Sequence, residues 1–141
     1  MATINTRRVV LGAVLGGVVW TLWDFAIYMA LLAPRYTAAQ NAGLFLKQPR
    51  YSFFICYWIV TLFIVSFILA WLYAGVRATF GAGPRTALAL GVLAGFAIAF
   101  PMNLSMATWG TFERIFPLCW LLDLWVGATL ATLVAGWLYK D

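Results

Sequence analysis

The chain has 141 residues, of which 65% are hydrophobic and 9% are charged. Soluble domains carry roughly 25% charged residues, so this chain has too little polar surface to fold in water and is predicted to be a membrane protein. Its net charge of +5 lies mostly outside the apolar segments, as in membrane loops, and forms no patch for binding nucleic acid. Histidine is absent, which excludes imidazole-dependent triads and histidine-ligated haem, chlorophyll or metal.

Four apolar segments predict an all-α membrane protein, a bundle of four transmembrane helices forming one domain over residues 1–141. The spans are expected at about residues 9–32, 51–74, 86–107 and 118–139, each near the ~20 residues that cross a bilayer. The first is too long for a signal-peptide core and is expected to be retained. The longest connection is expected over residues 33–50, and the bulky side chains of the second span favour a peripheral helix.

Residues 87–103 are expected to form the buried centre of this bundle. Small residues recur there at every fourth position and lead to a carboxamide: Ala87, Gly91, Gly95, Ala99 and Asn103. Such a row lets another helix approach closely, and Pro101 is expected to kink the helix. Further candidate packing positions are Gly12, Gly16, Gly127 and Ala131. We expect most of these rows to pack within the chain, with contact to another subunit as the alternative.

Two segment pairs suggest an internal repeat. LGAVLG at residues 11–16 resembles LGVLAG at residues 90–95, and AWLY at residues 70–73 resembles GWLY at residues 136–139. The pattern predicts two duplicated helical hairpins, related by an axis along the membrane normal.

A polar cluster is predicted inside the membrane, toward the side of the 33–50 connection. It comprises Asp24, Asn103 and Asp123, with Arg114 as a cation long enough to reach one carboxylate. Arg35 and Arg50 are the other candidates for that contact. A carboxylate at mid-span costs roughly 2.5–3.5 kcal/mol, so the acids should be paired or protonated. A hydrogen-bond network that fixes helix register is the favoured interpretation, and a proton or cation site is the alternative.

The remaining residues carry little chemistry. Cys56 and Cys119 lack metal spacing and are expected to be free, unless their helices are neighbours. The Arg7-Arg8 start, the two LGxxxG-type helices, the lone Asp24 and the final WLYK resemble small uncharacterised four-helix membrane proteins of bacteria. That resemblance implies the fold but no activity and no site residues.

We therefore expect an accessory subunit of a larger membrane complex of respiratory or photosynthetic type. Its helices would pack through their rows of small residues. The alternative is a small oligomeric transporter of protons, cations or solutes that uses Asp24 and Asp123. An enzyme acting on lipid is least favoured, and we expect no catalytic residues, no metal and no intrinsic cofactor, with lipid or pigment contact left open. The expected partners are membrane lipid and other membrane subunits or copies of the chain. The Arg pair favours both termini inside, and the resemblance implies a bacterial cytoplasmic membrane.

Overall fold

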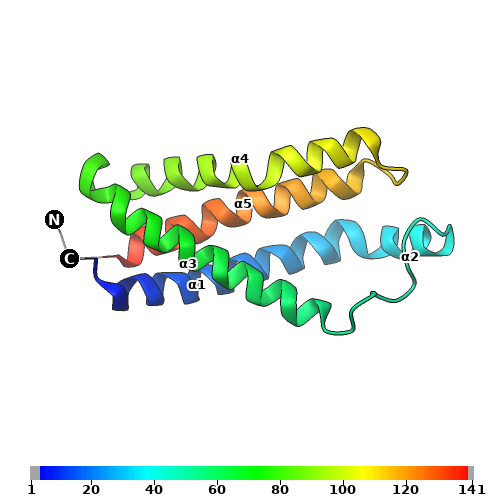
Figure 1. Cartoon of the computed structure of the whole chain (residues 1–141), viewed down its shortest axis with the longest axis horizontal. Helices are drawn as coiled ribbons and strands as arrows, with labels where there is room; N and C mark the ends of the chain where they lie inside the picture. Colours follow the sequence, from blue (N-terminus) through cyan, green and yellow to red (C-terminus); the bar gives the residue numbers. More distant parts are fainter. Residues whose placement is uncertain (1–3, 140–141) are drawn as a thin grey trace.

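The computed structural model describes residues 4–139, and every regular element in that range is helical (Figure 1). The last residue of the WLYK segment lies outside the described residues. The elements are α1 (Thr6–Ile27), the π-helix η1 (Tyr28–Leu32), α2 (Ala33–Asn41), α3 (Phe54–Phe80), α4 (Pro84–Trp109) and α5 (Ile115–Leu138). The first three are continuous, so the described chain has four helices long and apolar enough to cross a membrane. The predicted four-helix membrane bundle is confirmed, and the protein is an integral multi-pass membrane protein.

The bundle has two distinct ends (Figure 1). The terminal end holds the start of α1, the turn between α3 and α4, and the end of α5. The loop end holds the connections over residues 42–53 and 110–114. The terminal end is fastened by side chains, because the backbone N–H of Asn5 donates to the hydroxyl of Tyr139 at 2.8 Å and that of Gly83 donates to the hydroxyl of Tyr73 at 3.0 Å.

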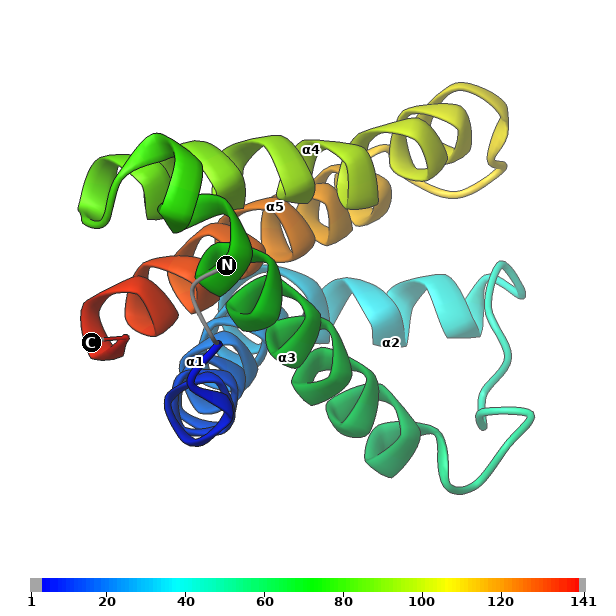
Figure 2. The same ribbon diagram turned by 60° about the vertical axis from the view of Figure 1, so that its left-hand side comes forward.

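The centre of the bundle is α5, which corrects the expectation that residues 87–103 occupy it. α5 contacts α1, α3 and α4, whereas α1 and α4 do not contact each other. In the most apolar stretch of each helix, 44% of α5 is buried against 28% of α4 and 22% of α3. The reason is that α4 has a single row of small residues, while α5 has small residues facing both α1 and α4. The least buried helix is α3, as predicted (Figure 2).

The first span continues beyond Leu32, where it was predicted to end. Pro34 was interpreted as part of a connection, but it lies in the first turn of α2, inside the continuous first span, and its missing N–H interrupts the helical hydrogen bonding there. The wider turn of η1 immediately precedes it and gives the proline ring room. The helix ends at Asn41, and Gly43 follows with a φ of 78°, a left-handed conformation that glycine adopts without strain.

The predicted small residues lie at the helix contacts. All eight packing positions named from the sequence are buried. A β-carbon added at Gly16 would lie 2.9 Å from the carbonyl oxygen of Ala131, and one at Gly91 would lie 2.8 Å from the Cα of Thr129. Both LGxxxG-type segments thus pack against the same helix, α5. The LGxxxG-type segment of the first predicted hairpin therefore packs against the second hairpin, whereas that of the second packs within its own hairpin. The duplication itself stays a prediction.

Candidate functional site: a carboxyl pair at the centre of the bundle

Small residues set the register that brings Asp24 and Asp123 together. α1 and α5 run antiparallel (Figure 1), and a β-carbon at Gly12 would meet Ala135 as one at Gly16 would meet Ala131. Each step of four residues along α1 is therefore matched by four residues back along α5. Continued toward the loop end, this register places Trp20 on Gly127 and Asp24 opposite Asp123.

The two carboxyl groups are neighbours in the interior. Asp123 is 4% exposed, and its carboxyl lies within hydrogen-bonding reach of Asp24. Its Oδ1 atom is buried without a hydrogen-bond partner among the described residues. Asp24 is half-buried, and its Oδ1 accepts a hydrogen bond from the indole Nε1 of Trp58 at 3.3 Å. The site thus contains two acids and a tryptophan donor, drawn from α1, α3 and α5.

Trp20 forms one wall of the site. Its side chain is fully buried and lies against Gly127, where a β-carbon would overlap the indole ring. Its Nε1 lies beside the carboxyl of Asp123 without completing a hydrogen bond to it, and has no other partner among the described residues. Neither Trp20 nor Trp58 was predicted to belong to this site. The available signal was the spacing of Trp20, one helical turn before Asp24 on the same face.

Asn103 and Arg114 lie outside this pair. The side-chain amide of Asn103 donates to the carbonyl oxygen of Ala99 at 2.8 Å, within its own helix, and α4 does not contact α1. Arg114 is exposed at the start of α5, and Arg35 forms an exposed ion pair with Glu113 at 2.9 Å. Arg50 is exposed in the 42–53 connection. Of the predicted cluster, the structure brings together only Asp24 and Asp123.

Aromatic side chains cover the loop end of the bundle. The ring of Phe45, from the 42–53 connection, lies 5.0 Å from that of Phe116, and the indole of Trp120 donates to the hydroxyl of Tyr36 at 3.1 Å. Phe112 completes the group, 5.3 Å from Phe45. We call these five residues the aromatic cap. Between the cap and Asp24 lies η1, and π-turns of this kind occur frequently at functional sites.

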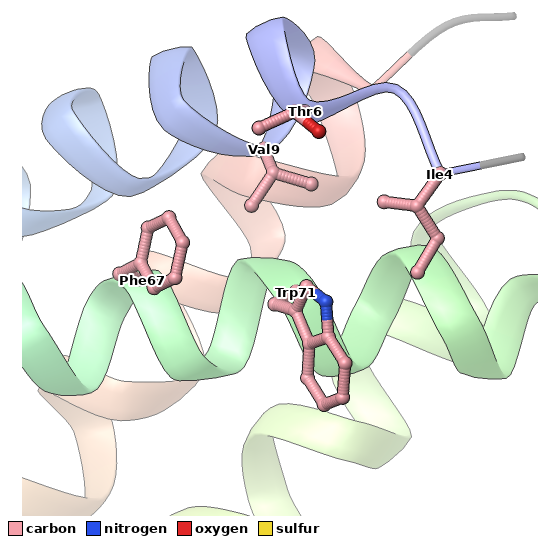
Figure 3. Close-up of a pocket in the computed structure, with 5 residues that line it drawn as sticks. All are labelled: Ile4, Thr6, Val9, Phe67 and Trp71. Atoms are coloured by element: carbon pink, nitrogen blue, oxygen red, sulfur yellow. The ribbon is translucent and has the colours of Figure 1, made fainter.

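A separate apolar groove lies on the outer surface at the terminal end (Figure 3). Its volume is about 260 Å³, and it lies between the start of α1 and the second half of α3. Its lining residues are Ile4, Thr6, Val9, Phe67 and Trp71. Val9 is about 22 Å along α1 from Asp24, so this groove faces lipid and is not part of the carboxyl site.

Cys56 is exposed on α3 and Cys119 is buried on α5, and both thiols are free.

Comparison with known proteins gives no match: no family model, no curated protein and no solved structure is significantly similar to this chain.

Proposed function

We propose that the protein is a small membrane transporter that carries protons or cations through the Asp24–Asp123 pair. The observation that carries the proposal is the meeting of two carboxyl groups on facing helices of a mostly apolar bundle. Asp123 lies about 12 Å along α5 from its start at the loop end. A carboxylate at mid-span costs roughly 2.5–3.5 kcal/mol, so two acids side by side at this depth favour a binding role.

Exchange with both sides of the membrane would have to pass the surroundings of the pair. The aromatic cap separates the pair from the loop end and would open to admit an ion. Toward the terminal end, two buried hydroxyls lie within the bundle, those of Ser66 and Thr132. The hydroxyl of Thr132 donates to the carbonyl oxygen of Ala128, whereas that of Ser66 has no partner among the described residues and would be free to relay a proton.

The Arg7-Arg8 pair supports an orientation better than the charge totals do, because the loop end also carries four cations: Arg35, Lys47, Arg50 and Arg114. The terminal end carries Arg7, Arg8, Arg77 and Arg85, and the first two directly precede the apolar part of α1. Positive residues beside a first span favour the cytoplasmic side. We propose that both termini lie in the cytoplasm and that the membrane is the bacterial cytoplasmic membrane.

Flux measurements in liposomes test the transport proposal. Wild-type protein should dissipate an imposed pH or cation gradient, followed with an internal pH- or cation-sensitive dye. Asp24→Asn and Asp123→Asn should each reduce this flux to the level of empty liposomes, because each removes one of the two acids. Glu113→Gln is the matched control, because that acid is exposed at the loop end, and it should retain wild-type flux. Equal flux in all four proteins would contradict the proposal.

A second candidate is the accessory role expected from the sequence. Two large side chains on the outer surface favour it, Trp109 at 84% exposed and Trp137 at 75% exposed, since a partner subunit would cover them. The small-residue rows support it less, because those of α1 and α4 are used inside the bundle against α5.

Native electrophoresis distinguishes this second candidate. An accessory subunit extracted in mild detergent from its source membrane should migrate with a complex much larger than a four-helix bundle. Replacing Trp109 or Trp137 by alanine should release it from that complex. Migration as a small homo-oligomer, unchanged by either substitution, would contradict the accessory role.

A further inference from the structure

Two buried polar atoms of the carboxyl site lack hydrogen-bond partners within the part of the chain that the structure describes. One is the acceptor Asp123 Oδ1, and the other is the donor Trp20 Nε1, which lies beside the same carboxyl. Buried polar groups in proteins nearly always form hydrogen bonds. A species that satisfies both atoms must accept a hydrogen from the indole and donate one to the carboxylate. Water does both, and needs two to four polar partners to be held in an interior.

The same donors argue against a metal cation. Hard cations such as Ca²⁺ take six to eight oxygen ligands and Mg²⁺ takes six. Here one oxygen of Asp24 already accepts from Trp58 Nε1, and Trp20 presents a second N–H to the site. An indole N–H presents a positive hydrogen, which repels a cation. No group of three or more histidine, cysteine or acidic side chains suited to a metal occurs among residues 4–139.

Among residues 4–139, no arginine or lysine forms an ion pair with either acid of the pair. The titratable groups that interact with this region are Tyr28 and Tyr36 from the η1–α2 segment and Cys119 from α5. Arg35 interacts with the Cys119 thiol but forms its ion pair with Glu113. Beside the pair, α3 provides the neutral Trp58. The polar side chain buried on α4 is the neutral Asn103.

Two adjacent carboxylates repel each other strongly, and sharing one proton relieves this repulsion. We infer that the ligand of the Asp24–Asp123 pair is a single proton, shared between the carboxyl groups, with a water molecule bridging Asp123 Oδ1 and Trp20 Nε1. The remaining negative charge is solvated by the indole N–H groups of Trp58 and Trp20. This inference rests on the proposed function and names the transported species.

Infrared spectroscopy of the protein in lipid nanodiscs tests the inference. Wild-type protein at neutral pH should show one buried protonated carboxyl band that shifts in D₂O. The double variant Asp24→Asn/Asp123→Asn should lose the band completely. Trp58→Phe, which removes the donor to Asp24, should move the pH at which the band disappears. Glu113→Gln should leave both the band and that pH unchanged.

Cation titration separates the inference from the proposed function. Replacing choline chloride with sodium, potassium or calcium chloride at constant ionic strength should leave the carboxyl band unchanged. If the intensity of the carboxyl band falls as the concentration of one of these cations increases, the inference of a shared proton is overturned. Cation flux through the same pair would still be consistent with the transport proposal. Absence of the band in wild-type protein, or its persistence in the double variant, would also overturn the inference. Unaltered flux in the single Asp variants would instead overturn transport.

Discussion

Replacing Gly127 by alanine should destabilise the bundle strongly, although it adds only one methyl group. The added β-carbon would overlap the indole of Trp20, and that ring is fully buried. Overpacking a well-packed interior costs about 1–3 kcal/mol and occasionally more. We expect a loss in the upper part of that range, measured as the free energy of unfolding in a mixed-detergent titration with SDS.

Gly75 provides the matched control for this substitution. It also lies inside a helix, but no atom lies within 4 Å of a β-carbon added there. Gly75→Ala should therefore stabilise the protein by about 0.5–1 kcal/mol, the usual gain from replacing a helical glycine. The double variant Gly127→Ala/Trp20→Leu should lose less than the sum of its single variants, because the smaller side chain vacates the contact. A Gly127→Ala protein as stable as Gly75→Ala would contradict the packing described here.

Replacing Gly91 by leucine should separate α4 from α5. A β-carbon at this position would meet the Cα of Thr129 at 2.8 Å and the carbonyl oxygen of the same residue at 3.2 Å. Backbone atoms cannot rotate aside as a side chain can, so the two helices must move apart along their contact. We expect a loss of about 3 kcal/mol or more in the same unfolding titration.

Ala97→Leu is the comparison for Gly91→Leu. It introduces the same side chain into the same helix, at an exposed position that faces lipid. Leucine is a good helix former and suits a lipid-facing surface, so this variant should unfold within about 0.5 kcal/mol of wild type. Equal stability of the two leucine variants would show that Gly91 does not lie at the contact with α5.

The membrane spans and the small-residue rows at their contacts could be predicted because both depend on local patterns. Length and hydropathy define a membrane helix, and rows of glycine and alanine at every fourth position define its close contacts. The row from Ala87 to Ala99 is buried as expected. The identity of the central helix could not be predicted in this way, since it depends on how many faces of a helix pack against other helices. α5 packs against α1 on one face and against α4 on another, and the second contact is evident only from the three-dimensional structure.

The site was harder to predict than the fold. Asp24 and Asp123 were expected at similar depth, and depth follows from counting residues along spans of known direction. Asn103 was expected toward the same side of the membrane, but it lies on α4, which does not contact α1. The contact of the Trp20 indole with Gly127 depends on the register between α1 and α5, which are distant in the sequence. The ring of Trp58 reaches Asp24 from α3, and no local pattern around it indicates that contact.

The position of α5 has a consequence for biosynthesis. It follows every other helix in the chain, yet it supplies contacts to all three. Until α5 has been translated, α1 and α4 lack the helix that packs against their glycine rows, and Asp24 lacks its acidic neighbour. Assembly of this interior must therefore wait until α5 has been translated, and a nascent chain stalled before α5 would be a natural substrate for membrane quality-control proteases.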